Sequence, residues 1–191
     1  MDADGLTLAC ATAAELRAAR RAGRRSALVG LGTANGIPDG PLVSFGLAGA
    51  LRDDLPVGTV LDATRVVAAD GEVLWEGEGL RVPGGTPATI LAADRIVDSA
   101  DDRRRAHEAS GADAADLESG PLAGTGRMQG VLRVVSDTPE HPLGALAGGV
   151  RPDGRNDWLG VARGVVRSPR AALNAARAMT KLVAAAKGLS W

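Results

Sequence analysis

The stretch that most constrains the fold is a short apolar run that ends abruptly in polar residues, 130–140 (GVLRVVSDTPE). Its β-branched residues favour a strand, and a near-continuous apolar run is typical of a strand buried on both faces. Open α/β sheets bind ligands beyond the carboxyl ends of their strands, so Asp137 is a candidate for a ligand-binding crevice. The alternative is a Ser-Asp-Thr-Pro turn in which Asp137 caps the next helix.

Strand and helix patterns alternate along the rest of the chain, which indicates an α/β protein. We expect strands at 6–11, 27–31, 42–45, 59–68 and 88–92, and helices at 13–23, 99–110, 158–166 and 171–187. Residues 70–87 are expected to form a hairpin or loop region. A chain of 191 residues suits a single domain, 1–191, in which a basic helical segment begins near residue 157.

Composition removes several classes of function. The 22 basic and 23 acidic side chains give a net charge of −1, so no overall field attracts nucleic acid. Cys10 is the single cysteine, which excludes an internal disulfide, and with two histidines beside it a zinc or iron site is not expected. No apolar run approaches the roughly 18 residues of a membrane span, and the acidic start MDADG differs from a basic export signal. We therefore expect a cytoplasmic protein that uses no metal or organic cofactor.

A glycine-rich turn, Gly30-x-Gly32-x-x-x-Gly36, follows the second expected strand and could cradle a phosphate or a ribose. The dinucleotide fingerprint requires GxGxxG at the opening of a helix, whereas residues 37–41 (IPDGP) are typical of a turn. A Rossmann cofactor site is therefore not expected.

Two further carboxylates follow expected strands. Glu15 lies in the first turn of the helix at 13–23, and Glu118 closes a short segment of apolar and acidic residues at 112–118. For each, the structural alternative is a helix-start glutamate that stabilises the helix dipole. The charge cluster at 101–105 (DDRRR) is interpreted as a solvated helix face with local pairing.

Four stretches, in order, resemble the nucleoside phosphorylase and nucleosidase superfamily. They are the strand and helix that hold Glu15, and the stretches 43–67 (VSFGLAGALRDDLPVGTVLDATRVV), 115–123 (ADLESGPLA) and 132–140 (LRVVSDTPE). They are similar to the family's first-helix glutamate, small-residue loop and strand, ribose-binding glutamate and base-binding aspartate. The stretches 107–119 and 150–177 most resemble the hopanoid-associated branch, which is thought to remove adenine from adenosylhopane. The resemblance implies a three-layer αβα fold with a central mixed β-sheet, in a trimmed form.

The resemblance also implies an activity: cleavage of the N-glycosidic bond of a purine nucleoside, either adenosylhopane or another 5′-substituted adenosine. Asp137 would bond the purine and help to protonate its N7, and Glu15 would orient or deprotonate the attacking water. Glu118, with Leu117 beside it, would hold the ribose hydroxyls. Such cleavage passes through an oxocarbenium-like state, which requires an acid, a base and negative charge near the sugar.

The remaining implied site residues support these acids. Arg133 and Ser136 would position them, and four residues of the small-residue loop would lie against the ribose or the nucleophile: Gly46, Leu47, Ala48 and Gly49. No arginine of that loop is placed for phosphate, which favours hydrolysis, so phosphate would be a co-substrate only in a phosphorylase. The resemblance further implies a homo-oligomer.

The chain also departs from the family pattern. A five-residue connection at 37–41 stands in place of a helix, the 70–87 region is short, and no aromatic residue lies between Trp75 and Trp158 to stack on a purine. Leu117 replaces a methionine and Ala50 a glycine. These departures favour the alternative of a non-catalytic nucleoside-binding or scaffold protein.

The C-terminal segment is basic, although the chain as a whole is nearly neutral. No acidic residue follows Asp157, whereas six basic residues do: Arg163, Arg167, Arg170, Arg177, Lys181 and Lys187. We expect a packing helix with a basic outer face, and a weak peripheral contact with anionic lipid is the alternative.

Overall fold

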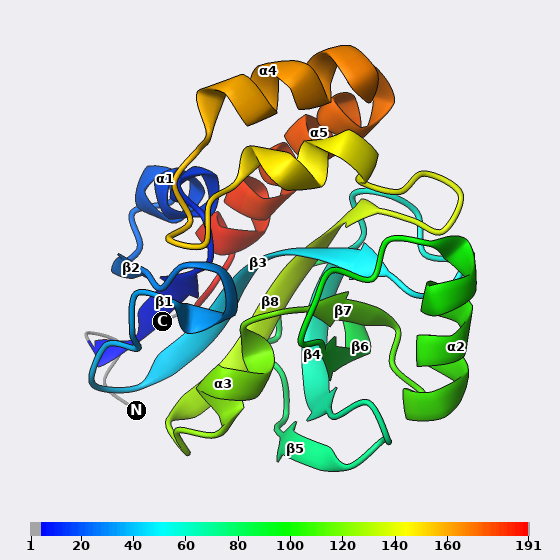
Figure 1. The fold of residues 1–191 in the computed structure, drawn as a ribbon. Coiled ribbons are helices and arrows are strands. Elements are labelled where there is room, and N and C mark those ends of the chain that lie inside the picture. The colour runs from blue at the N-terminus through cyan, green and yellow to red at the C-terminus, as the bar shows by residue number, and fades with distance from the viewer. Residues whose placement is uncertain (1–4, 191) are drawn as a thin grey trace.

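The computed structural model describes residues 5–190, and within that range eight strands form one sheet with helices around it (Figure 1). The acidic start of the chain falls mostly outside the described residues. The strands are β1 (Thr7–Cys10), β2 (Ser26–Leu28), β3 (Leu42–Ala50), β4 (Val60–Val67), β5 (Val73–Glu76), β6 (Thr86–Ala92), β7 (Ala114–Asp116) and β8 (Met128–Asp137). The helices are α1 (Ala13–Arg21), α2 (Ala100–Ser110), α3 (Ser119–Ala123), α4 (Trp158–Arg167) and α5 (Pro169–Lys187), with 3-10 turns η2 (Leu31–Thr33) and η3 (Gly144–Gly149). The predicted α/β class with a central mixed sheet is confirmed.

Five strands of the sheet close into a ring. β3 pairs with β8 in parallel, and β8 pairs with β4 antiparallel. β4 then pairs with β6, and β6 with β7, both in parallel. β7 returns antiparallel to β3 through Gly49 and Ala50. The remaining strands extend the sheet outward, β1 and β2 beside β3 and β5 beside β4.

Alternation along β8 divides its side chains between two cores. Leu132 and Val134 pack against α1 and α5, whereas Val131 and Val135 face the inside of the ring. Because side chains of a strand alternate with a period of two, Arg133 and Asp137 share the inward face with Val131 and Val135. The apolar run that predicted this strand therefore also places two charged side chains inside the fold.

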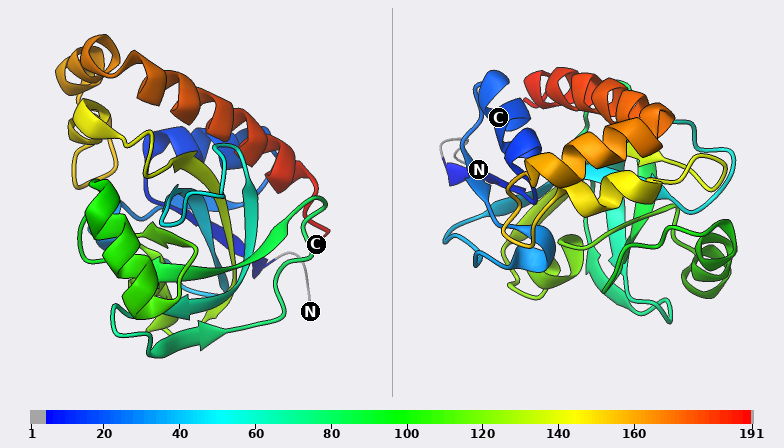
Figure 2. Two further views of the ribbon diagram at one scale, coloured as in Figure 1. Left: turned by 90° about the vertical axis from the view of Figure 1, so that its right-hand side faces the viewer. Right: turned by 45° about the horizontal axis from the view of Figure 1, so that its top comes forward.

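A local cap and the packing of the helices on the sheet both matter for the site. α1 begins at a capping box in which the Thr12 side chain accepts a hydrogen bond from the Glu15 amide and the Glu15 carboxylate accepts from the Thr12 amide. α1 and α5 pack on one face of the sheet, and α4 crosses η3 on the same side (Figure 2). Within residues 5–190, no helix has the length and apolar character needed to cross a membrane.

Several of the expected boundaries were wrong. The strand expected at 42–45, for example, continues to Ala50. The second strand ends at Leu28 rather than at residue 31, because Gly30 and Gly32 take positive φ angles of 77° and 54° that turn the chain into η2. The short helix α3 follows Glu118, where we expected no helix from the sequence.

Candidate active site

The three carboxylates singled out in the sequence line one cavity of about 350 Å³. Glu15, Glu118 and Asp137 are nevertheless almost completely buried, at 4 %, 3 % and 1 % exposure. Buried carboxylates require partners that offset the loss of water, so the hydrogen bonds and ion pairs of each define what it can do.

Strand direction explains how these residues meet. β1, β3 and β8 are mutually parallel, so Glu15, just after β1, and Asp137, at the end of β8, lie at the same edge of the sheet. Glu118 arrives differently, because β7 runs antiparallel to β3 and carries the chain back along it. The sequence placed all three beyond strand ends, but only the antiparallel return brings Glu118 beside the middle of β3.

Glu15 both takes part in the cap of α1 and lines the cavity. Its Oε2 accepts hydrogen bonds from the Thr12 amide at 2.8 Å and the Thr12 hydroxyl at 3.0 Å, and its Oε1 accepts from the Leu47 amide at 2.8 Å. Burial raises the pKa of Glu15, while Arg133 and these hydrogen bonds act in the opposite direction. The helix-start reading is therefore correct for Glu15, but this glutamate also faces the cavity.

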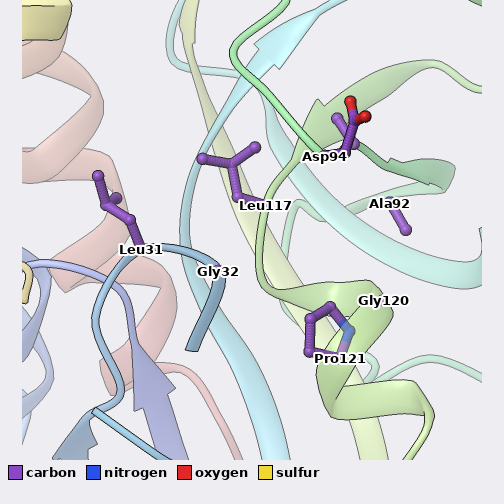
Figure 3. A pocket seen from close by; sticks show the side chains of 8 residues that line it. Leu31, Gly32, Ala92, Asp94, Leu117, Gly120 and Pro121 are labelled. Atoms are coloured by element: carbon purple, nitrogen blue, oxygen red, sulfur yellow. The ribbon is translucent and has the colours of Figure 1, made fainter. Parts of the chain in front are cut away.

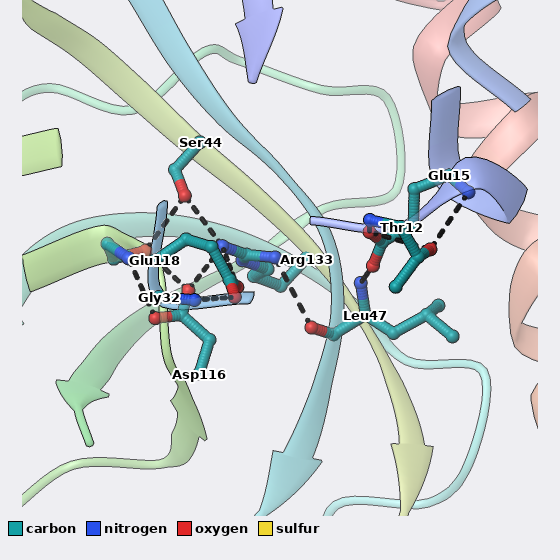
Figure 4. Close-up of polar contacts among 9 residues, drawn as sticks. Thr12, Glu15, Gly32, Ser44, Leu47, Asp116, Glu118 and Arg133 are labelled. Carbon is teal, nitrogen blue, oxygen red and sulfur yellow. Dashed lines mark hydrogen bonds and ion pairs between the residues drawn. The ribbon is translucent and has the colours of Figure 1, made fainter. Parts of the chain in front are cut away.

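Arg133 makes contacts with several polar groups around the cavity (Figure 4). Its side chain is fully buried. Its Nη2 donates to the Ser44 hydroxyl at 2.6 Å and forms ion pairs with Asp116 at 2.6 Å and Glu118 at 3.5 Å. Its Nη1 donates to the Leu47 carbonyl at 3.4 Å. Arg133 thus stands behind Glu15 and Glu118 and stabilises their ionised forms.

Glu118 accepts fewer hydrogen bonds than Glu15 and Asp137 do. Its Oε1 accepts from the Gly32 amide at 3.1 Å, and Arg133 lies near its Oε2. Burial raises the pKa of Glu118 to about 7; Arg133 opposes this shift, and Asp116 adds to it. Glu118 does stand at a helix start, as the N-cap residue of α3, but its side chain makes no capping bond and is buried. The helix-start reading is therefore correct for its position in the chain and wrong in placing it on the surface.

Asp137 is held by an arginine that the sequence assigned to the surface. Its Oδ2 pairs with Arg103, and its Oδ1 accepts from the Ser136 hydroxyl at 2.5 Å. Arg103 also donates to the Ala50 carbonyl at 2.9 Å. Burial raises the pKa of Asp137, while Arg103 and Ser136 lower it. The interpretation of the 101–105 cluster as wholly solvated was therefore wrong for Arg103, and so was the helix-cap reading of Asp137, which lies within β8.

The small residues of β3 make room for these side chains. Gly46 stands opposite Arg133 in the β3–β8 register, and Gly49 stands opposite Asp137. A Cβ on Gly46 would lie 2.3 Å from Glu15 Oε1, and a Cβ on Gly49 would lie 2.9 Å from Asp137 Oδ2. The glycines thus accommodate the chain's own charged groups.

The other predicted site residues divide into two groups. Five line the cavity: Leu47, Ala48, Gly49, Leu117 and Ser136. Gly46 and Arg133 lie behind the cavity wall and act on it through Glu15 and Glu118. Sequence reasoning missed Arg103, Asp116 and Ser44, whose partners are distant in the chain, although it did single out Gly32 as part of a possible ribose cradle.

Most of the remaining cavity wall is aliphatic, and Thr12, Asp116 and Asn156 are further polar residues on it. Ile96 and Val97 lie on it with Leu143, Leu146 and Met179, and among the described residues that line it none is aromatic. Its single basic lining residue is Arg95. A flat apolar ligand would therefore pack against aliphatic side chains. An anionic ligand would meet four carboxylates, Glu15, Asp116, Glu118 and Asp137.

A second hollow of about 520 Å³ adjoins this cavity (Figure 3). It is lined by Leu31, Gly32, Ala92, Ala93, Asp94, Leu117, Gly120 and Pro121. Leu31, Ala93 and Leu117 border both spaces. The hollow therefore begins beside Glu118, away from Asp137. No cluster of three or more potential metal ligands occurs in the part of the chain that the structure describes.

Comparisons with known proteins support the fold. No family model and no curated protein matches the chain. Solved structures do resemble it: 5′-methylthioadenosine/S-adenosylhomocysteine nucleosidase from S. pneumoniae, bound to a transition-state inhibitor, has a TM-score of 0.61 and 14 % identity, covering 97 % of this chain and 99 % of that one. The nucleosidase of the same name from Colwellia psychrerythraea 34H, in complex with adenine, has a TM-score of 0.59 and 13 % identity, covering 97 % and 96 %. Futalosine hydrolase of Helicobacter pylori strain 26695 has a TM-score of 0.57 and 15 % identity, covering 94 % and 97 %. At these identities, the likeness establishes the nucleosidase-like fold.

Proposed function

We propose that this protein hydrolyses the N-glycosidic bond of a purine nucleoside. The observation that carries the proposal is the convergence of three buried carboxylates, Glu15, Glu118 and Asp137, on one cavity with aliphatic walls. Perturbed acids gathered in a cleft are typical of catalytic sites. The fold shared with solved nucleosidases and futalosine hydrolase supports the same reaction class.

Each carboxylate has a position that suits one part of the reaction. Asp137 accepts a hydrogen bond from the purine and shares a proton with N7 as the base departs, an event that burial favours by raising its pKa. Glu118 accepts hydrogen bonds from the ribose hydroxyls. Glu15 orients and deprotonates the water, and its negative charge stabilises the oxocarbenium-like sugar.

Water is the proposed nucleophile rather than phosphate. A phosphate bound beside the sugar would need cationic or amide donors, whereas the described residues that line the cavity offer four carboxylates and a single basic residue, Arg95. Arg133 lies behind the wall and is already engaged by Asp116, Glu118 and Ser44.

The adjoining hollow suggests the kind of substituent on the ribose. It opens beside Glu118 and is lined mainly by apolar residues, with Leu117 on the border. An apolar group on the 5′ carbon fits this position, in line with a 5′-substituted adenosine or adenosylhopane as substrate. A polar or phosphorylated 5′ group would meet apolar side chains and Asp94 there.

Base release measured by chromatography tests the proposal. Wild type should release adenine from adenosine or from an apolar 5′-substituted adenosine without phosphate, and Glu118→Gln and Asp137→Asn should each lower kcat/KM by roughly 100-fold or more. Glu76→Gln, on an exposed residue of β5, is the matched control and should leave the rate unchanged. Circular dichroism should be used to check that each variant is folded. The check is needed because Asp137→Asn leaves the buried Arg103 without its carboxylate partner.

The rival reading is a nucleoside-binding protein without catalysis. It is favoured by the internal partners of the carboxylates, since all the oxygens of Glu15 and Asp137 already accept hydrogen bonds within the chain. Ligand-induced stabilisation without base release across the nucleosides tested would select it. Strict dependence on phosphate with a ribose 1-phosphate product would select a phosphorylase.

A further inference from the structure

The side of α4 that carries Gly160 and Gly164 packs against η3. A Cβ on Gly160 would lie 2.5 Å from the Gly148 carbonyl oxygen, and a Cβ on Gly164 would lie 2.9 Å from the Leu146 Cα. The glycine side of the helix therefore presses directly on η3, and no larger residue fits there. Val161 lies on the same inward side and lines the cavity.

This packing turns the large apolar side chains outward. Trp158, Leu159 and Val166 are 72 %, 69 % and 81 % exposed, and Val165 is exposed as well. Exposures this high mean that the described part of the chain leaves this side of α4 uncovered. A surface helix normally buries such residues and exposes its small and polar ones, so the orientation of α4 is inverted.

Helical geometry places these side chains on one arc, which we call the outer face of α4. Successive residues of an α-helix are about 100° apart around its axis, so Val165, Trp158, Ala162, Val166 and Leu159 follow one another around roughly one third of the circumference. Arg163 and Arg167 come next along the same edge, and both are exposed. The outer face is thus a contiguous apolar surface bordered by positive charge.

We propose that the outer face of α4 docks on an anionic lipid surface. Such a surface offers an apolar layer for Trp158, Leu159 and Val166 and negatively charged headgroups for Arg163 and Arg167. Tryptophan suits this boundary because its ring is apolar and its indole N–H is a donor. This docking is independent of the proposed catalytic activity.

Charge selects lipid over a second copy of the chain. No acidic residue follows Asp157, and the Asp157 carboxylate already accepts from the Leu159 amide at 3.3 Å. A symmetric dimer through the outer face would bring the basic edges of two identical helices together, which is unfavourable. An anionic lipid surface complements the same edge.

Co-sedimentation with vesicles tests the docking. Wild type should bind vesicles of equal parts phosphatidylcholine and phosphatidylglycerol and should bind pure phosphatidylcholine far less. The double variant Trp158→Ser/Val166→Ser should lower the partition coefficient roughly tenfold or more, because it removes the largest apolar areas. Arg163→Gln/Arg167→Gln should lower it roughly fivefold per arginine at low salt, and the effect should vanish at high salt.

The control carries the same kind of change on another face. Val73, on β5, is also exposed, and Val73→Ser should leave vesicle binding unchanged. Tryptophan emission provides a second readout: anionic vesicles should shift wild-type emission to shorter wavelength, and the shift should be absent in Trp158→Phe. The proposal is overturned if wild type does not bind the anionic vesicles at low salt, or if Trp158→Ser/Val166→Ser binds them as wild type does. It is also overturned if that variant instead dissociates an oligomer that shows no vesicle binding.

Discussion

Among the charged residues of α2, Arg103 should be the one whose removal lowers the free energy of unfolding most, because it forms a buried ion pair with Asp137. Both side chains are almost wholly buried, at 1 % and 2 % exposure, so water cannot replace the missing partner when one is removed. Removing one member of a buried pair costs about 3–5 kcal/mol. Arg103→Met also leaves the Ala50 carbonyl without its donor, which adds about 1 kcal/mol. We therefore expect Arg103→Met to lower the free energy of unfolding by about 4 kcal/mol or more at pH 7.

The loss should depend on pH in a defined direction. Without Arg103, burial holds the folded-state pKa of Asp137 still further above its value in the unfolded chain. A carboxyl with a raised folded pKa destabilises the fold when it must ionise, so the deficit is present at neutral pH. The deficit should shrink as the pH falls and should be smallest below the unfolded pKa of about 4, where Asp137 is protonated in both states.

Urea unfolding of matched variants measures the effect. Arg104→Met is the control, because Arg104 is the next residue, is 63 % exposed and pairs only with exposed Asp101; it should change the unfolding free energy by less than about 0.5 kcal/mol. Arg103→Met/Asp137→Asn should recover a large part of the loss, since it removes the unpaired charge as well. The reasoning is refuted if Arg103→Met costs no more than Arg104→Met, or if the double variant is as unstable as the sum of its single variants.

Three further outcomes follow from the site. Burial raises the pKa of Glu118 to about 7, so KM for the nucleoside should rise by up to about tenfold per pH unit below 7 as Glu118 takes up a proton. Glu118→Gln should remove this dependence. A KM that does not change with pH in wild type would contradict the assignment. Gly46→Ala should destabilise the fold by about 3 kcal/mol because its Cβ meets the Glu15 carboxylate, whereas Gly148→Ala, with open space at its Cβ, should stay within about 0.5 kcal/mol in thermal or urea unfolding. The buried thiol of Cys10, whose pKa is raised by burial and by Glu15, should react with a thiol reagent only at the rate of unfolding, and rapid labelling of the native protein would show that its environment is open.

Local sequence patterns predicted most of the elements. The helix expected from residue 13 begins at Ala13, and the apolar run after Gly130 predicted β8, because caps and side-chain periods act over a few residues. The same patterns placed Glu15, Glu118 and Asp137 just after strands, and the structure brings all three to one cavity. Their catalytic roles remain predictions.

The partners of those residues could not be found locally. Three consecutive arginines, Arg103, Arg104 and Arg105, are equivalent in the sequence, and only the angle at which α2 docks decides that Arg103 alone turns inward to Asp137. Likewise, ring closure through β7 sets where Glu118 meets Arg133. The sequence thus determined the periodic elements and the chemistry available at their ends. Tertiary structure decided which charges are buried together, because a buried charge is stable only beside a partner that the folded chain brings from far away.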